Sequence, residues 1–177
     1  MRITLLIFLF ANTLIINPAF ADQEEEKKLA LMLLHQATNA YGEKHDICNE
    51  NKKRNQLSSD TLKQLKEIQI ESLRKGLMYL SEKAFNQCVQ PERGLLAERL
   101  LHIQSWPEDK QTAFDRIMLL TMDSTRKLIF DISAVNTEVL FYQLPKAEQD
   151  KLLAIQAMQT PFDPMLVWGL MVPINDE

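Results

Sequence analysis

The sequence predicts an all-α protein, a single-domain bundle of five to seven helices with one intramolecular disulfide. Apolar residues recur at steps of three and four along most of the chain, which is the spacing that places side chains on one helical face. Only four glycines occur in 177 residues. No internal repeat or low-complexity linker interrupts the pattern, so we expect one folded domain over residues 22–177. Four prolines divide the apolar segments, namely Pro91, Pro107, Pro145 and Pro164.

The first 21 residues have the composition of a secretory signal peptide. Arg2 supplies the positive charge of a short N-terminal region, and an apolar run follows from Ile3 to Ile16. Ala19-Phe20-Ala21 then matches the small-x-small cleavage pattern. We therefore expect cleavage after Ala21. The alternative is an uncleaved membrane anchor, but Asn12 interrupts the apolar run, which is short for a membrane span of about 20 residues.

The export signal predicts a periplasmic or secreted location with no stable membrane anchor after cleavage. The chain contains no Asn-x-Ser/Thr sequence, which favours a bacterial envelope over a eukaryotic secretory route. Its 20 Lys and Arg stand against 24 Asp and Glu, a net charge of −4, and removal of Arg2 makes it −5. This acidic balance argues against a nucleic-acid partner and against adhesion to anionic lipid.

Two segments precede the longest apolar pattern. Residues Gln23 to Tyr41 predict a first helix, and Gly42 is its candidate C-cap. Residues Glu43 to Gln56 are polar and lack apolar periodicity. They predict a surface loop that contains Cys48.

The longest apolar pattern runs from Leu57 to Pro91 and predicts a single amphipathic helix. Ser58, Ser59 and Asp60 are candidate N-cap residues at its start. Gly76 costs about 1 kcal/mol relative to alanine but allows a close helix crossing. Pro91 ends the run, because the residue before a proline disfavours helical geometry, and begins a third helix that ends near Ser105. The apolar face of the long helix consists of Leu62, Leu65, Ile68, Leu73, Leu77, Leu80, Ala84 and Cys88.

The two cysteines of the chain are Cys48 and Cys88. In an oxidising compartment the simplest expectation is a disulfide between them. Such a bond would close a loop of 40 residues and stabilise the fold by about 3 to 4.7 kcal/mol in the chain-entropy model. Two free thiols or a metal pair are the alternative, but no CxxC sequence and no further ligand at a metal-site spacing accompany them.

The last third of the chain predicts three more helical segments. One long helix or two stacked pieces span Pro107 to Tyr142, where β-branched residues after Ile129 leave a strand conceivable. A further helix covers Lys146 to Gln159. Asp163-Pro164 then has the form of an N-cap and first helical position for an apolar tail.

The apolar tail is either the last piece of the core or an exposed strip. We favour the core, because soluble proteins seldom leave large apolar patches uncovered. A partner protein would contact either the long helix from Pro107 to Tyr142 or, if it is exposed, this tail. The residues that we assign to the tail surface are Met165, Trp168 and Met171.

No residue pattern predicts a catalytic centre, a metal site or a cofactor. Phosphate loops, dinucleotide fingerprints and a G-x-S-x-G nucleophile turn are absent from the sequence. A metal site assembled from His45, Asp46 and His102 would need these residues to meet in the fold. Paired carboxylates are the remaining catalytic option, since two acids suffice for glycan hydrolysis. The candidates are Glu67, Glu71, Asp115, Asp123 and Glu138.

Together these observations predict an exported, non-catalytic helical protein of the bacterial envelope that binds another protein. It would act as an adaptor, an inhibitor or an immunity-type partner, and self-association into a homo-oligomer is compatible with the same surface. The first alternative is an acid-pair glycan hydrolase of the envelope. The second is a periplasmic helical chaperone or stress sensor, which would hold exposed apolar residues in a concave cradle.

Overall fold

The computed structural model describes residues 18–107 and 133–172. Within these two ranges the chain forms six α-helices and one short 3-10 helix, with no strand, and Cys48 is bonded to Cys88. The prediction of an all-α fold with one intramolecular disulfide is confirmed. Most of the predicted signal peptide and residues 108–132 of the segment expected after Pro107 lie outside the described residues.

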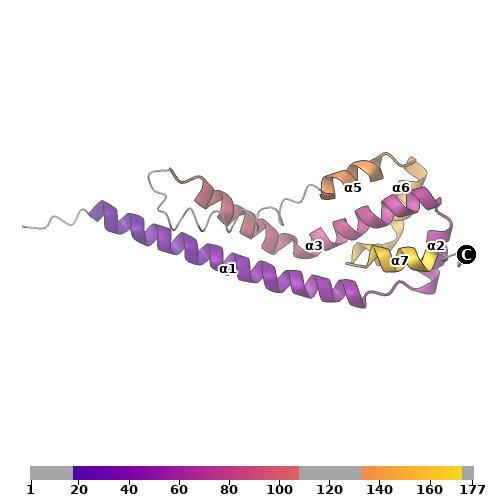
Figure 1. The fold of residues 1–177 in the computed structure, drawn as a ribbon, viewed down its shortest axis with the longest axis horizontal. Coiled ribbons are helices and arrows are strands. Elements are labelled where there is room, and N and C mark those ends of the chain that lie inside the picture. Colours follow the sequence, from indigo (N-terminus) through magenta and orange to yellow (C-terminus); the bar gives the residue numbers. More distant parts are fainter. Residues whose placement is uncertain (1–17, 108–132, 173–177) are drawn as a thin grey trace, which may run out of the picture.

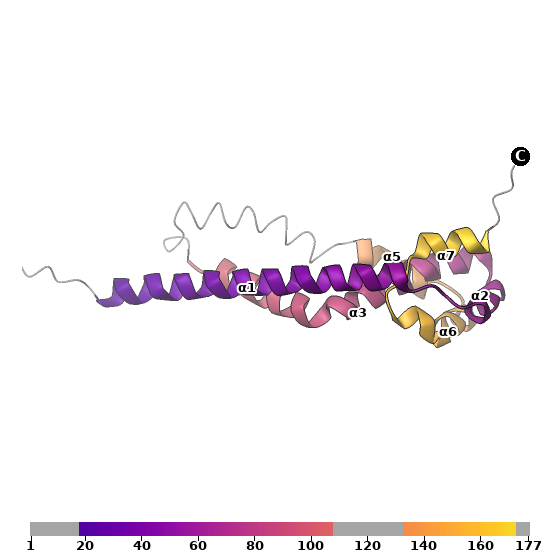
Figure 2. The same ribbon diagram turned by 90° about the horizontal axis from the view of Figure 1, so that it is seen from below.

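Two long antiparallel helices form the axis of the molecule (Figures 1 and 2). Helix α1, Pro18–Arg54, has 37 residues and helix α3, Ile70–Gln104, has 35, so each is about 50 to 55 Å long. The first turns of α1 extend beyond the end of α3 (Figure 1). None of the described helices is long and apolar enough to cross a membrane. Where the two helices pack, the buried residues are Ala30, Leu34, Ala37, Leu96, Leu100 and Ile103.

The predicted end of the first helix at Gly42 and the predicted loop over Glu43 to Gln56 are wrong. Helix α1 continues to Arg54, and no glycine of the described residues has a positive φ. The physical reason is that the polar stretch has a packing face made of aromatic and sulfur groups. Tyr41, His45 and Cys48 recur at helical spacing, and the His45 ring contacts Phe85 of α3 with centroids 5.2 Å apart.

The predicted single helix from Leu57 to Pro91 is broken at residues 67–69. Helix α2, Ser59–Lys66, begins as predicted, with the Ser58 side chain accepting a hydrogen bond from Thr61 N. Helix α3 starts only at Ile70. The Glu148 carboxylate accepts a hydrogen bond from Gln69 N at 3.1 Å, so a side chain from a distant helix caps the start of α3.

Pro91 lies inside α3, so the prediction that it separates two helices is also wrong. A proline in a helix interior removes one backbone hydrogen bond and costs about 3 kcal/mol or more. Pro91 is exposed, and the helix continues past it because the residues beyond pack onto α1. Figure 1 shows α3 bowed near its middle, as expected of a helix that contains proline. The helix ends at Gln104 with Ser105 as C-cap, as predicted.

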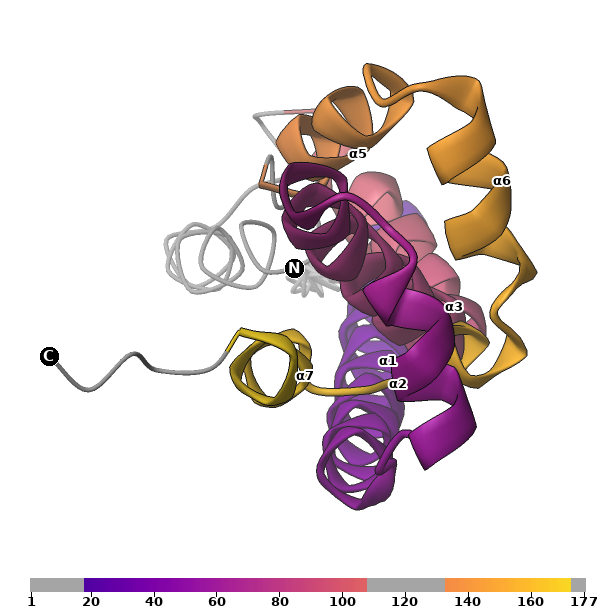
Figure 3. The same ribbon diagram turned by 90° about the vertical axis from the view of Figure 1, so that its right-hand side faces the viewer.

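Four short elements surround the first half of α3 and with α2 form a helical head (Figure 3). They are α5, Ser133–Tyr142; α6, Lys146–Ala154; the 3-10 helix η2, Gln156–Gln159; and α7, Pro164–Met171. The helical interpretation of residues 133–142 is therefore confirmed, and the helix predicted over Lys146 to Gln159 divides into α6 and η2. The largest fully buried side chains of the head are Phe141, Phe162, Leu65, Leu73, Leu77, Leu152 and Met158.

Hydrogen bonds between distant residues hold the head together. The Asn55 carboxamide, just beyond α1, donates to Thr160 Oγ1 at 2.9 Å and also lies within hydrogen-bond distance of three backbone carbonyls of residues 157–161. Ser81 Oγ donates to the carbonyl of Phe162 at 3.0 Å. Gln149 Nε2 donates to the carbonyl of Leu144 at 2.8 Å. The bonds made by Asn55 and Ser81 fix the segment that leads from η2 to α7, whereas the bond made by Gln149 ties α6 to the turn before it.

Gly76 brings α6 close to α3, which confirms the close helix crossing predicted at this residue. A β-carbon at Gly76 would lie 2.5 Å from Leu152 Cδ1. Leu152 is buried, so its side chain would have to shift and repack to admit a methyl group at Gly76.

We expect Gly76→Ala to lower the free energy of unfolding by about 1 to 3 kcal/mol, because the added methyl group overpacks the contact with Leu152. Gly94→Ala is the matched control in the same helix, since nothing lies within 4 Å of a β-carbon there. The control substitution should raise the free energy of unfolding by up to about 1 kcal/mol, because alanine has a higher helix propensity than glycine. Urea unfolding followed by circular dichroism measures both, and equal changes in the two variants would contradict the close-contact assignment.

We expect the double variant Cys48→Ala/Cys88→Ala to lose about 4 kcal/mol of stability, because the bridge no longer restricts the unfolded chain. Urea unfolding with and without reductant measures the loss. Reductant should destabilise the wild type by a similar amount and leave the double variant unchanged. A wild type that is insensitive to reductant while its thiols become reactive would show that the bridge contributes little.

Candidate functional site

Helix α7 is held at its start by the cap that the sequence predicts. Asp163 Oδ1 accepts hydrogen bonds from Met165 N at 2.9 Å and Leu166 N at 3.2 Å, and Pro164 occupies the first turn. The cap satisfies two backbone donors that a helix start leaves without intrahelical partners. A helix of eight residues is thereby fixed in orientation.

The two sides of α7 differ in exposure. Pro164 and Val167 are buried, and Val167 belongs to the core of the head. On the other side, Met165 is 67% exposed, Leu166 51% and Leu170 59%. Gly169 is exposed between them. We call Met165, Leu166, Gly169 and Leu170 the α7 outer face.

The structure separates the three residues of the predicted partner surface. Met165 is exposed, whereas Trp168 and Met171 are half-buried and pack against the core of the head. The tail is therefore part of the core along one side and exposed along the other. Leu166 and Leu170 were missed because the continuous apolar run hides the side of the helix that faces the core. The role of the surface in binding stays a prediction.

Three adjacent hollows lie along the middle of α3, and the Gln87 side chain borders all of them. The first, of about 190 Å³, lies between α3 and the α6–η2 segment. The second, of about 320 Å³, lies between α3 and α5. The third, of about 390 Å³, lies beside Cys88 and the segment after η2. None of them was predicted, since their walls come from elements far apart in the sequence.

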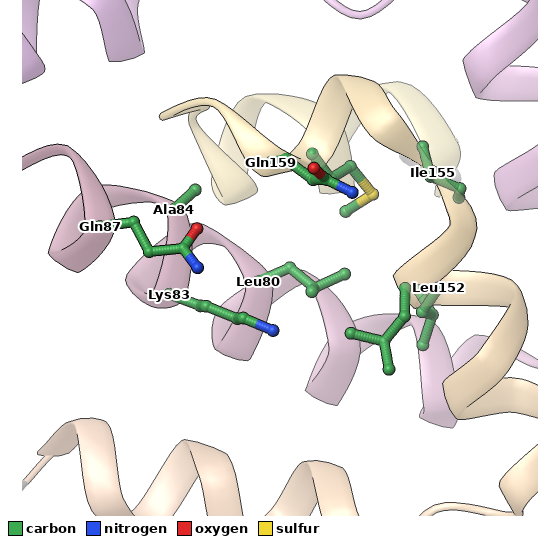
Figure 4. A pocket seen from close by; sticks show the side chains of 9 residues that line it. Leu80, Lys83, Ala84, Gln87, Leu152, Ile155 and Gln159 are labelled. Atoms are coloured by element: carbon green, nitrogen blue, oxygen red, sulfur yellow. The ribbon is translucent and has the colours of Figure 1, made fainter.

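The hollow between α3 and α6–η2 has an apolar floor and a polar rim (Figure 4). We call it the α3–η2 cleft. Its rim consists of Lys83 and Gln87 from α3 and Gln159 from η2, and these side chains face the same space as the apolar ones. The floor consists of Leu80, Ala84, Leu152, Leu153, Ile155 and Met158.

The groove between α3 and α5 brings two carboxylates, Glu82 and Glu138, to one hollow. Glu82 accepts a hydrogen bond from Thr137 Oγ1, and Glu138 is exposed. The other predicted acid candidates do not join them. Glu67 and Glu71 are exposed on or beside the start of α3, and Asp115 and Asp123 lie outside the described residues.

Tyr79 lies at the base of this groove and stacks on Phe141 with ring centroids 4.3 Å apart. Burial raises the pKa of the Tyr79 phenol above its usual range, and the neighbouring Tyr142 and Glu138 add to the effect. The phenol is therefore a neutral part of the packing at neutral pH.

The fold does not bring together the residues of the predicted assembled metal site. His45 lies against Phe85, whereas His102 lies against Trp106. Phe85 and His102 are separated by 17 positions of one helix, or about 25 Å. In the part of the chain that the structure describes, no group of three or more His, Cys, Asp or Glu side chains is placed to hold a metal ion.

Comparisons of the chain with protein-family models, with curated proteins and with solved structures gave no match.

We expect Tyr79→Phe to weaken the loss of stability that the wild type shows at alkaline pH. Because the folded pKa is raised, the contribution of this phenol is fully present below its unfolded pKa of about 10 and is lost as pH rises toward the folded value. Urea unfolding at about pH 9 and about pH 11 measures the difference, with phenylalanine preserving the ring stack. Identical losses in the two proteins would contradict burial of the phenol.

Proposed function

We propose that this protein is an exported, non-catalytic binding protein of the bacterial envelope that contacts a partner protein through the α7 outer face. It would work as an adaptor, an inhibitor or an immunity-type partner. The observation that carries the proposal is that every residue of this outward-facing side of α7 is apolar. Contiguous exposed apolar side chains mark interaction surfaces, and the centres of protein interfaces are poor in charge and rich in methionine and aromatic residues.

The rigidity of α7 supports the same proposal. The Asp163 cap and the buried Val167 hold the helix in one orientation. The segment before it is fixed by Asn55 and Ser81. A surface that is ordered before binding loses less conformational entropy when a partner associates.

Gly169 also supports a binding role for α7, because glycine destabilises a helix and is not required here by contacts within the chain. A β-carbon at Gly169 would meet nothing within 4 Å, so contacts within the chain do not require glycine here. Glycine in a helix interior costs about 1 kcal/mol relative to alanine. Placed between Leu166 and Leu170, it leaves a gap in the α7 outer face where the backbone of a partner can approach closely.

The proposed location rests on the sequence and on the disulfide. The features of residues 1–21 favour export, and the Cys48–Cys88 bond is of the kind that persists in oxidising compartments. Helix α1 begins at Pro18, so cleavage after Ala21 would make Asp22 the first residue of both the mature chain and the helix.

An acid-pair glycan hydrolase is the second candidate, and the observation in its favour is the shared groove of Glu82 and Glu138. Exposure of Glu138 and the hydrogen bond from Thr137 to Glu82 weigh against it, because a general acid has to be shielded and free to donate its proton. A chaperone is less well supported than either, since the outer face of a surface helix is convex and forms no cradle.

We expect a photo-reactive residue placed at position 170 to cross-link one partner protein in native envelopes, while the same residue at position 101 gives no such product. Leu170 and Leu101 are both 59% exposed, so they match in residue type and accessibility. Mass spectrometry of the cross-linked product identifies the partner. A product of twice the mass of this chain would show that the partner is a second copy.

Once the partner is identified and purified, Leu170→Gln should weaken the binding free energy of the complex by more than about 1 kcal/mol, as expected for an apolar residue at an interface centre. Leu101→Gln should leave the affinity unchanged. Calorimetric titration of the purified proteins measures both. Equal affinities for Leu170→Gln and the wild type would place the contact elsewhere and overturn the assignment to α7.

A further inference from the structure

We propose that the α3–η2 cleft is a binding site for a small apolar carboxylate, such as a free short-chain or medium-chain fatty acid. The alkyl chain would lie on the apolar floor of the cleft. The carboxylate would lie at the rim, held by the Lys83 ammonium with the carboxamides of Gln87 and Gln159 as further donors. This site is separate from the α7 outer face and does not depend on it.

The size and lining of the cleft define the apolar part of the ligand. Its volume is about 190 Å³, and apolar cavities of about 150 Å³ bind molecules of the size of benzene. Leu152 and Met158, which lie at its floor, are buried in the core of the head. An unbranched chain of about eight carbons or a single aromatic ring is therefore the appropriate size.

Lys83 defines the charge of the ligand. This side chain is half-buried at the rim, and within the described residues no carboxylate lies close enough to form an ion pair with it. Its Nζ lies 5.7 Å from the centre of the Tyr79 ring. Glu82 and Glu138 line the neighbouring groove, which Lys83 also borders.

The polar rim contributes donors of the geometry that a carboxylate requires. The carboxamides of Gln87 and Gln159 come from opposite walls and each supplies an N–H group. A cation flanked by two amide donors matches an anion with two oxygens. The rim contains no carboxylate of its own. An apolar amine would therefore place its charge next to Lys83 without an acceptor of opposite charge.

A free acid fits the cleft better than the end of a peptide chain. Peptide recognition relies on sheet edges, long grooves or nests of backbone N–H groups. The walls that α3 and α6 give to the cleft are helical backbone, whose N–H groups are used within those helices, so they form no such nest.

The test uses octanoate as the probe, octylammonium as the charge-reversed probe, and methyl NMR of the methionines in the mature chain. Met158 lines the cleft, whereas Met165 is exposed on α7, so the two methyl groups report binding in the cleft and non-specific adsorption respectively. We expect octanoate to shift the Met158 signal saturably, to leave Met165 unchanged, and to bind at least 10-fold more tightly than octylammonium.

Variants of Lys83 test the role assigned to its charge. Lys83→Met keeps the apolar stem and should weaken octanoate binding about 10- to 100-fold, the range of a charge-assisted hydrogen bond. Lys83→Glu should reverse the preference toward octylammonium. Lys63→Met, which removes a charge from a 75% exposed side chain on α2, should bind like the wild type. Unfolding curves verify that each variant is folded.

Three results would overturn the proposal. The first is equal affinity for octanoate and octylammonium. The second is a Met165 shift that follows the Met158 shift, which would indicate adsorption to apolar surface. The third is unchanged octanoate binding by folded Lys83→Met. A short peptide ending in leucine is titrated alongside, and if it binds at the cleft while octanoate does not, the ligand is a chain end and the assignment to a free acid is wrong.

Discussion

The bond between Cys48 and Cys88 fixes the register of α1 on α3, and the positions of the other elements depend on this register. The Cα atoms of the two residues are 6.0 Å apart. The bridge lies between the two buried clusters of the molecule, one along the α1–α3 pair and one in the head. Alanines and leucines alone would allow α1 to slide by a turn at little cost, because each turn presents a similar apolar face. A covalent bond between defined residues removes that freedom.

The fixed register places Asn55 at the head, and Asn55 in turn positions the elements that carry both proposed surfaces. Its carboxamide holds residues 157–161 at the end of η2. Gln159 at the rim of the cleft lies within that segment, and α7 follows it directly. Ser81 reinforces the connection through the carbonyl of Phe162. A chain of contacts therefore runs from the disulfide to the cleft and to the α7 outer face.

The sequence predicts the features of this fold that depend on neighbouring residues. The caps at Ser58 and Asp163 and the end of α3 at Ser105 are signalled within a few positions and are confirmed. Most of the predicted apolar positions from Leu65 to Ala84 are buried as well, although they belong to two helices and the break between them. The disulfide was predictable because a chain with only two cysteines, and with the signal-peptide composition of residues 1–21, leaves one simple pairing. The crossing at Gly76 was predictable because glycine inside a helix has a cost that close packing offsets.

The features that could not be predicted depend on residues far apart in the sequence. Pro91 and Gly42 were interpreted by their local preferences, but packing against α1 and the bridge at Cys48 keep both helices continuous. The break before Ile70 leaves the apolar periodicity intact, and the cap that stabilises it comes from Glu148, 79 positions later. The walls of the cleft likewise come from two regions of the chain. Local preferences of this kind amount to a few kcal/mol and yield to tertiary packing.

The cleft and the core of the head share side chains, which has a consequence for how a ligand would act. Leu152 packs against Gly76 and also forms part of the cleft floor. Met158 belongs to the core and to the cleft in the same way. A ligand seated there adds contacts to residues that already hold α6 and η2 against α3, so it binds the folded state and stabilises it by mass action. Helices α6 and α7 flank α3 on different sides (Figure 3). The α7 outer face therefore stays open to a partner whether or not the cleft is filled.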